Sequence, residues 1–413
     1  MPSPVVAAIM DEMLARGTLL SLAFWLVFLG GVRVAVIPPE SCGVEDEVQI
    51  AEAAQGAADW MARNQNDDGS YVYLYFKDSD TIPNDYNEVR HAGVTMALYQ
   101  AAGRLQDPDA LAAADDALAW MQDHLVRRHD WAALAGSDRE NRPPLGASAL
   151  MLVSLAERRL ATGDEQYDEL MHEVARYIAA LQRGDGGFHI GWDVGADQPD
   201  TYGTSRYYPG EANWALALMH EAFPGEGWDE HARAALQFIT TIRDDVEDVE
   251  FPPLADQWAA YSLAEMVEWG LTNQQIDYAR SLAGRFGLLV RTESQREGSW
   301  YGSELRGRDS RASGVGTWAE GLAGLWRVAA QDDRLSDEKD KIEERLHCVA
   351  GILADRQYTA EEAAAYPRPG LIEGAWFRNE ETRMDDQQHA FSGMLYALDA
   401  IAEHKTRAPE LLP

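Results

Sequence analysis

Polar residues that could carry chemistry crowd into residues 85–95, where Glu88, Arg90 and His91 bring a carboxylate, a guanidinium and an imidazole into one turn. An apolar helical pattern follows directly, so this turn opens a buried helix. Polar groups in such a place are costly to desolvate unless they pair with one another or with a ligand. The stretch therefore predicts the edge of a pocket, with His91 either a functional group or a histidine satisfied inside the core.

The composition of the 413-residue chain excludes one class of partner and allows a large core. A net charge of -34 leaves no basic excess to neutralise phosphates, so no nucleic-acid partner is expected. Hydrophobic residues make up 46% of the chain and include 13 Trp, which is enough for a sizeable interior. The excess of Asp and Glu is typical of a salt-adapted, halophilic-like protein with a soluble acidic surface. It does not itself indicate a function.

The N-terminal region carries an apolar run, TLLSLAFWLVFLGGV, which Arg33 and a further apolar stretch extend to residue 37. With the Arg33 side chain snorkelling toward the interface, residues 18–37 are long enough to span a membrane. No A-x-A cleavage site follows, which favours an uncleaved signal anchor over a cleaved signal peptide. Arg16 and Arg33 flank the segment on opposite sides and leave its orientation open. Because only a short N-terminal tail then stays inside, the large domain is expected outside the cytoplasm, in the periplasm or at the cell surface.

The rest of the chain reads as a succession of helices, each with apolar residues at i, i+3, i+4 and i+7. Strand-like alternation is nearly absent, and residues 71–76 (YVYLYF) are the one good candidate, as a short hairpin arm. The predicted helices cover residues 47–65, 86–104, 108–126, 145–161, 165–183, 208–223, 228–243, 255–270, 273–291, 312–330, 336–356 and 384–403.

These helices alternate in character along the chain. The odd members, starting with 47–65, carry charge along one face, whereas the even members, starting with 86–104, are richer in small and apolar residues. The first set fits a half-solvated outer ring and the second an inner ring packed on both sides. Six such pairs predict an all-α (α/α)6 barrel as one domain. The chain is accordingly divided into a tail, anchor and linker (1–43), a toroid domain (44–406) and a C-terminal tail (407–413).

A related sequence motif follows the ends of several outer helices. Its glycine permits a left-handed turn after the helix, and its aromatic residue can fill the crevice between neighbouring hairpins. The copies of this motif are Gln65-Asn-Asp-Asp-Gly-Ser-Tyr71, Gln182-Arg-Gly-Asp-Gly-Gly-Phe188, Gln295-Arg-Glu-Gly-Ser-Trp300 and, more loosely, Glu373-Gly-Ala-Trp376. They resemble the Gln…Asp-Gly-x-Trp repeats of the α/α-toroid superfamily, which includes terpene cyclases, prenyltransferases and the six-hairpin glycosidases, epimerases and lyases. The resemblance implies the same fold for most of the chain.

In such a barrel the N-terminal ends of the inner helices converge on one rim, so polar residues at these helix starts are candidate site residues. Helix caps alone favour Asp and Glu in a first turn, but they do not explain the cations Arg90, His91 and His389. The candidate catalytic residues are Glu88, Glu211, His91, Asp256 and Asp386. The candidate substrate-binding residues are Tyr86, Asn87, Arg90, Tyr207, Tyr208, Trp258, Trp300, Glu320, Trp376, Gln388 and His389.

The aromatic residues of this rim point toward a carbohydrate. Sugar rings stack on aromatic faces while neighbouring polar groups hold their hydroxyls, although some of these rings only fill gaps between hairpins. Other chemistries lack their signatures: the sequence has no Asp-x-Asp-Asp motif of terpene cyclases, no Cys/His zinc constellation, no Walker loop and no dinucleotide fingerprint. Cys42 and Cys348 form at most one disulfide. A reaction without metal or cofactor is expected.

The leading hypothesis is a membrane-anchored glycoside hydrolase acting on a poly- or oligosaccharide, with Glu88 and Glu211 as general acid and as base or nucleophile. Arg90 and His91 would hold an acidic or hydroxyl-rich sugar. The alternative is a uronate lyase or C5-epimerase, in which Tyr86 or His91 removes the α-proton while Arg90 neutralises the carboxylate. A non-catalytic toroid that binds a glycan or a membrane partner is the third hypothesis, and a terpene-type reaction the fourth.

Overall fold

The computed structural model describes residues 4–44, 46–136, 141–249 and 254–407. The chain divides into a larger unit, Cys42–Arg291 with Ser310–Pro413, and a smaller unit, Met1–Ser41 with Thr292–Asp309. The sequence-based division assigned residues 292–309 to the toroid domain, whereas the structure groups them with the N-terminal helix. The tail expected at 407–413 lies, beyond Arg407, outside the described residues.

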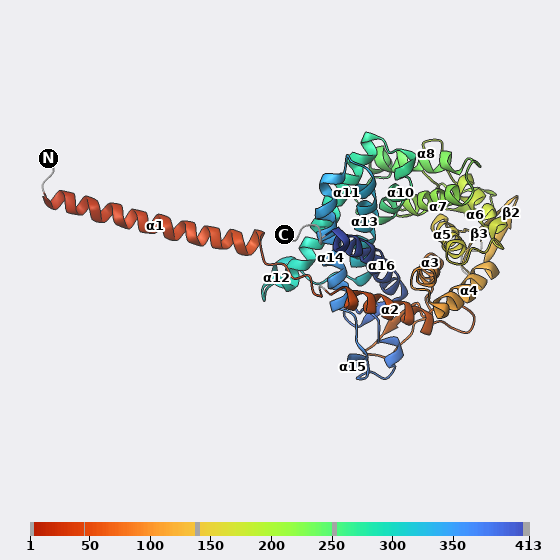
Figure 1. Ribbon diagram of the computed structural model, residues 1–413, viewed down its shortest axis with the longest axis horizontal. Helices are drawn as coiled ribbons and strands as arrows, with labels where there is room; N and C mark the ends of the chain where they lie inside the picture. Colours follow the sequence, from red (N-terminus) through yellow and green to blue (C-terminus); the bar gives the residue numbers. More distant parts are fainter. Residues whose placement is uncertain (1–3, 45, 137–140, 250–253, 408–413) are drawn as a thin grey trace. The chain divides into compact units, whose positions relative to one another are not determined.

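Six pairs of helices form two concentric rings in the described part of the larger unit (Figure 1). Each inner helix contacts the next, and the last contacts the first, which closes the ring. The inner helices are α3 (Glu88–Arg104), α5 (Leu145–Thr162), α7 (Tyr208–Ala222), α10 (Gln257–Glu265), α13 (Ala312–Gln331) and α16 (Met384–Arg407). The outer helices are α2 (Glu47–Arg63), α4 (Pro108–Asp123), α6 (Asp168–Ala180), α8 (Trp228–Thr241), α11 (Asn273–Glu297) and α14 (Lys339–Asp355). The predicted (α/α)6 barrel is confirmed.

Side-chain size and polarity explain which ring each helix joins. Every residue of α5 from Leu145 to Ala156 is buried, because small and apolar residues occupy all of its faces. The outer helix α6 instead buries one stripe, including Leu170, Val174 and Ile178, and leaves its charged face to solvent.

The repeated motif connects neighbouring outer helices at two places, α2 to α4 and α6 to α8. The side-chain amide of Gln65 donates to the carbonyl of Gly69 in its own turn (3.2 Å) and to the carbonyl of Ala113 on the next outer helix (2.7 Å). Gln182, two hairpins further along the chain, repeats both contacts, with Gly186 (3.3 Å) and an α8 carbonyl (2.9 Å). Both glycines have positive φ and pack on a neighbouring helix carbonyl where a Cβ would overlap it. The motif therefore links the end of α2 to α4 and the end of α6 to α8 in the outer ring.

Short elements fill the connections between the rings. The expected strand at residues 71–76 is confirmed for Leu74–Phe76 (β1), which pairs antiparallel with β6 (Glu381–Arg383) from the last hairpin. Phe76 at the end of β1 also forms an antiparallel bridge with Thr81, so a short local hairpin is present as well. The other antiparallel pairs are β2 (Leu125–Arg128) with β3 (Trp131–Leu134) and β4 (Trp192–Asp193) with β5 (Gln198–Pro199). The short helices are α9 (Arg243–Val246), α12 (Gly302–Arg306), α15 (Ala360–Ala363) and 3-10 turns at Val267–Trp269, Ser336–Glu338 and Pro369–Leu371.

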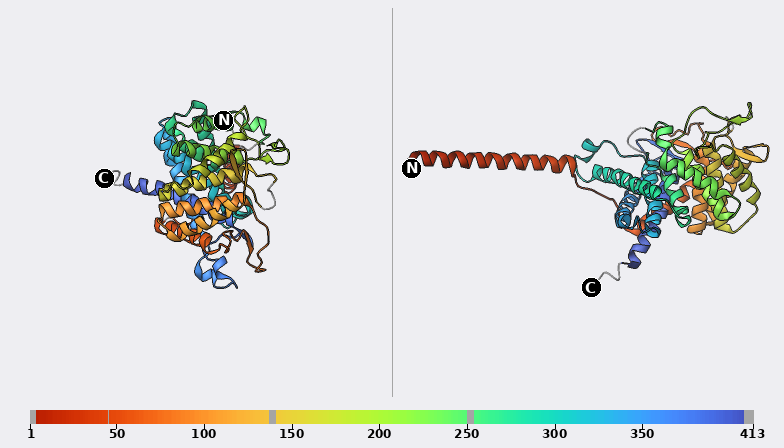
Figure 2. Two further views of the ribbon diagram at one scale, coloured as in Figure 1. Left: turned by 90° about the vertical axis from the view of Figure 1, so that its right-hand side faces the viewer. Right: turned by 90° about the horizontal axis from the view of Figure 1, so that it is seen from above.

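The smaller unit is dominated by α1 (Pro4–Val36), one continuous helix (Figure 2). Its segment Glu12–Ala35 has a mean hydropathy of 1.8 and no buried residue, so by length and composition it could cross a membrane. At 1.5 Å per residue the segment is about 36 Å long, which exceeds the roughly 30 Å hydrocarbon core of a bilayer. In the larger unit, Cys42 and Cys348 are joined in a disulfide that ties the start of this unit to α14.

Candidate active site

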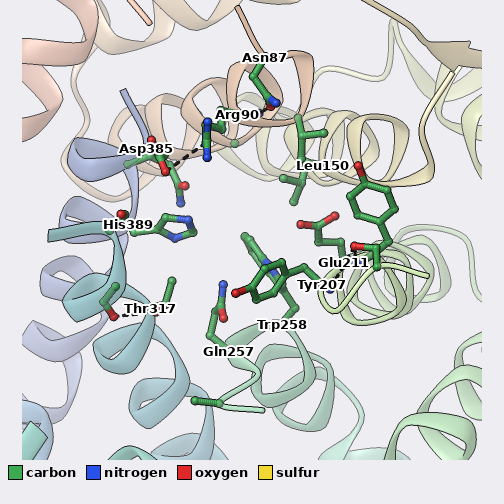
Figure 3. Close-up of a pocket in the computed structure, with 18 of the residues that line it drawn as sticks. Asn87, Arg90, Leu150, Tyr207, Glu211, Gln257, Trp258, Thr317, Asp385 and His389 are labelled. Atoms are coloured by element: carbon green, nitrogen blue, oxygen red, sulfur yellow. Dashed lines mark hydrogen bonds and ion pairs between the residues drawn. The ribbon is translucent and has the colours of Figure 1, made fainter. Parts of the chain in front are cut away.

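A cavity of about 600 Å³ lies inside the larger unit, where the N-terminal ends of the inner helices meet (Figure 3). All six inner helices, or the residues directly before them, contribute to its wall, as the predicted convergence of helix starts requires. Of the second hairpin only Leu150 lines the cavity, and it brings no carboxylate. The sequence-based candidates that line it are Asn87, Arg90, Tyr207, Tyr208, Glu211, Trp258, Gln388 and His389.

Glu211 is a buried acid in the first turn of α7. Its residue is 4% exposed, and its Oε2 makes no hydrogen bond within the described residues. Burial, with a smaller contribution from the nearby Asp256, raises the pKa of Glu211 from 4.5 to about 8. A Cβ at Gly146 would lie 2.5 Å from this oxygen, so the glycine makes the room that the carboxyl group occupies. Glu211 is therefore a protonated carboxylic acid at neutral pH.

His389 lies on the wall opposite Glu211 (Figure 3), backed by a carboxylate. Its Nδ1 is 2.8 Å from Oε2 of the fully buried Glu320, whose other oxygen accepts from Gln388 at 3.3 Å. Burial disfavours the charged imidazole, but the Glu320 carboxylate outweighs this effect and raises the pKa of His389 above its ordinary value. Because Nδ1 is engaged, Nε2 is the atom that can exchange a proton in the cavity. Glu320, predicted to bind substrate, lies behind His389 and does not line the cavity.

Asp385 is the second carboxylate of the cavity wall. Its Oδ2 lies 3.2 Å from Nε of Arg90 and 3.0 Å from Nη2 of Arg383, while its buried Oδ1 has no hydrogen-bond partner among the described residues. Arg383 is placed by the β1–β6 pairing, and Arg90 also contacts the Tyr73 hydroxyl. The sequence-based candidates included the neighbouring Asp386 but not Asp385. Adjacent helical residues point about 100° apart, so only the helix orientation decides which one faces the cavity.

Two further acidic candidates from inner-helix starts, Asp386 and Asp256, have structural partners. Asp386 accepts from the backbone N–H of Ser313 (3.1 Å) and of Arg383 (3.0 Å), and so joins α16 to α13. Burial and the adjacent Asp385 raise the pKa of Asp386 to about 6. Asp256 caps α10 and forms an ion pair with Arg243, which is 1% exposed. Neither side chain lines the cavity.

The polar stretch at residues 85–95 is split between the cavity and the core. Arg90 and the preceding Asn87 face the cavity, whereas His91 is fully buried, with Nδ1 2.6 Å from the Tyr86 hydroxyl and Nε2 3.0 Å from a backbone carbonyl of α4. Burial lowers the pKa of His91 to about 3, so it is a neutral core histidine. Glu88 packs against Gly136 and does not line the cavity.

Aromatic candidates also separate into two groups. Trp258 and Tyr207 line the cavity and are 3% and 47% exposed, so one is a fixed wall and the other an accessible ring. Trp376 is buried away from the cavity, with Nε1 donating to the Leu353 carbonyl at 2.8 Å. Trp300 belongs to the smaller unit and is 90% exposed.

A second cavity of about 380 Å³ shares Tyr208 with the first. Arg142 on its wall is held 3.2 Å from Oδ2 of Asp200, and a backbone hydrogen bond from Leu145 to Ile190 (2.8 Å) joins the two loops that form it. None of its residues except Tyr208 was a candidate, because loop residues without a motif give no signal in the sequence. In the described part of the chain, no group of three or more His, Cys, Asp or Glu side chains is placed to hold a metal ion.

Two concentric helical rings around a cavity at the inner-helix starts define the α/α-toroid class, the six-hairpin glycosidase-like fold. Solved structures with this fold match the chain at low identity, for example 11% to 15%. They include cellobiose 2-epimerase from Bacillus thermoamylovorans (TM-score 0.59, 11% identity, 86% of this chain and 100% of that one). A second is an inactive variant of an alpha-1,6-mannanase of Salegentibacter with alpha-1,6-mannotriose (0.59, 12%, 85% and 99%). A third is an unsaturated glucuronyl hydrolase specific for heparin (0.58, 14%, 87% and 99%). No family model matches the sequence, and a comparison with curated proteins finds no match.

Proposed function

We propose that the protein is a carbohydrate-active enzyme, most simply a glycoside hydrolase, in which Glu211 is the general acid. The observation that carries this proposal is the state of Glu211, a buried acid on the cavity wall with a pKa of about 8 and an unpartnered Oε2. A general acid needs such a raised pKa to keep its proton near neutral pH. Similarity in fold to a mannanase, a glucuronyl hydrolase and a sugar epimerase supports a carbohydrate as the substrate.

Asp385 is the proposed base and replaces Glu88, which the sequence paired with Glu211 without dividing the two roles between them. Glu211 gives its proton to the glycosidic oxygen as the bond from that oxygen to the anomeric carbon breaks. A water molecule then attacks the anomeric carbon and loses a proton to Asp385. Arg90 and Arg383 both contact Oδ2 of Asp385, which fixes the orientation of this carboxylate on the cavity wall.

The proposed substrate is an oligosaccharide or polysaccharide. The second cavity adds about 380 Å³ next to Tyr208, which supports a neighbouring sugar unit on the far side of that ring. Arg142 and Asp200 present charged groups there that can bind hydroxyls. In the main cavity, Trp258 and Tyr207 offer aromatic faces for a sugar ring.

The test is turnover of an oligosaccharide library by the full-length chain in detergent, followed by variants. Glu211→Gln and Asp385→Asn are each expected to lower kcat/KM by about a thousandfold, the scale of general acid and base contributions. Asp399→Asn, on the same helix as Asp385 but paired with Arg104 at its far end, is the matched control and should keep full activity. Wild-type kcat/KM should fall as the pH rises through about 8, because Glu211 then loses its proton. New reducing ends that persist in both variants would refute the assignment.

A sugar epimerase or isomerase is the second candidate, favoured by the His389–Glu320 pair. His389 Nε2 would take a proton from a substrate carbon and Glu211, on the opposite wall, would deliver one. Epimerisation in heavy water places deuterium on that carbon without new reducing ends. His389→Asn should then abolish turnover, whereas in a hydrolase it should lower kcat/KM by no more than about tenfold.

We also propose that α1 anchors the enzyme in a membrane, with the large domain outside the cytoplasm. The length and exposed apolar surface of Glu12–Ala35 support the anchor. The Cys42–Cys348 disulfide supports an oxidising compartment, since such bonds are rare in the cytosol. Resistance of the membrane-bound chain to alkaline carbonate extraction tests the anchor, and release by carbonate would refute it.

A further inference from the structure

The aromatic residue in one copy of the repeated motif differs from its counterparts in exposure. Tyr71, Phe188 and Trp376 are 2% to 4% exposed and fill space within the toroid, but Trp300 is 90% exposed. Leu305, close to it in the sequence, is 48% exposed. Two large apolar side chains left in water within one short segment mark an interaction surface. The partner is indicated by what surrounds the segment.

The segment that carries Trp300 packs beside the end of α1. Arg306 donates to the backbone carbonyl of Ala35 at 3.3 Å, and Gly298 lies so close to the carbonyl of Pro39 that a Cβ there would overlap it. Ala35 is the last residue of the apolar membrane-length segment. These contacts place residues 298–306 at the level where a membrane-spanning α1 would leave the hydrocarbon.

The smaller unit also lacks the acidity of the rest of the chain. It contains five arginines and seven Asp or Glu residues, a net charge of -2, whereas the whole chain carries -34. Anionic headgroups repel a strongly acidic surface. A nearly neutral unit is therefore the part of this protein that can approach a bilayer.

We propose that residues 298–306 form a second membrane contact, with Trp300 and Leu305 in the interfacial layer next to the end of α1. The proposal rests on α1 as a membrane anchor. Trp is suited to this layer because its ring is apolar while its N–H keeps a partner among water and headgroups. The lipid surface would thus cover the two exposed apolar side chains of this segment.

The test uses the full-length chain in nanodiscs of phosphatidylcholine and phosphatidylglycerol, with a fluorescent label at single cysteines. Trp300→Cys and Leu305→Cys report on the interfacial layer, and Leu22→Cys reports on α1. Leu160→Cys, at a leucine of the larger unit that is 73% exposed, is the matched control. The two native cysteines are disulfide-bonded and do not react. Because the replaced side chains are exposed, each variant should keep the wild-type circular dichroism.

Lipids with a nitroxide near the headgroups are expected to quench labels at 300 and 305 at least about threefold more than the label at 160. A nitroxide deep in the acyl chains should quench the label at 22. Equal quenching at 300, 305 and 160, with 22 quenched, overturns the interfacial contact and leaves the anchor in place. An unquenched label at 22 overturns both proposals, and neither result bears on the catalytic assignment.

Discussion

Replacement of Glu211 by Gln should stabilise the protein while it removes activity. At pH 7 the unfolded chain holds Glu211 as a carboxylate, with the ordinary pKa of 4.5, whereas the folded chain holds it as an acid with a pKa of about 8. Taking up that proton costs about 1.4 kcal/mol per pH unit above 4.5, or roughly 3 kcal/mol at pH 7. Gln is neutral at every pH, but its amide N–H would lack a partner at a cost of about 1 kcal/mol. The net expected gain is about 2 kcal/mol.

The pH dependence gives this prediction its sign. Because the folded pKa of Glu211 lies above the unfolded one, the wild type loses stability as the pH rises from 4.5 to about 8. The Gln variant does not, so its advantage should grow from about -1 kcal/mol at pH 4.5 to about +2 kcal/mol at pH 7. For a domain of this size the latter corresponds to a rise in Tm of about 3 °C.

The assay is urea unfolding followed by far-ultraviolet circular dichroism, at pH 5, 7 and 9 in one detergent. Glu361→Gln removes a negative charge from an exposed position and controls for the change in net charge. The difference between Glu211→Gln and the wild type should rise with pH, whereas the control should stay level. A difference for Glu211→Gln that is equal at pH 5 and pH 7 would refute the protonated acid on which the proposed mechanism depends.

Three further predictions concern packing, a buried charge and the disulfide. Gly146→Ala should lower kcat/KM at least tenfold, because its Cβ would displace Glu211. The control Gly284→Ala, where a Cβ meets nothing within 4 Å, should retain activity, and equal kcat/KM values for the two variants would contradict the reasoning. Asp256→Asn should cost about 3 kcal/mol in urea unfolding, since Arg243 would keep a buried charge without its partner; an unchanged midpoint would count against this ion pair. Phosphine reduction of the disulfide should lower the free energy of unfolding by about 4 kcal/mol, because the unfolded chain then loses a cross-link between residues 306 positions apart. An unaltered Tm would show that this cross-link contributes little to stability.

Most of the fold could be predicted because its signals are local. The helix predicted at residues 145–161 is Leu145–Thr162, since its small and apolar residues continue around the helix without a break. The helix predicted at 255–270 ends at Glu265, where the chain tightens into the 3-10 turn Val267–Trp269. The spacing of apolar residues cannot distinguish a 3-10 turn from a further turn of α-helix, because both turns bury the same side chains. Strand β1 was partly found, but its partner 305 residues later was not.

The candidate site was predictable at the level of helix starts and not at the level of single side chains. Glu211 and Arg90 were found because they open inner helices. The choice of Glu88 over Asp385 as the partner of Glu211 depended on the rotation of α3 and α16 about their axes, which follows from packing across the ring. His91 shows the same effect, since one residue of displacement from Arg90 moves it from the cavity into the core.

The amino-acid sequence alone determined the helical hairpins, their order in two rings and the rim on which polar residues gather, because each follows from periodicity and composition along short segments. Only the tertiary structure decided which carboxylates line the cavity, that Glu211 keeps its proton there and that the Trp300 side chain is exposed. Burial and neighbouring charges set those properties, and both arise from residues far apart in the chain that folding brings together.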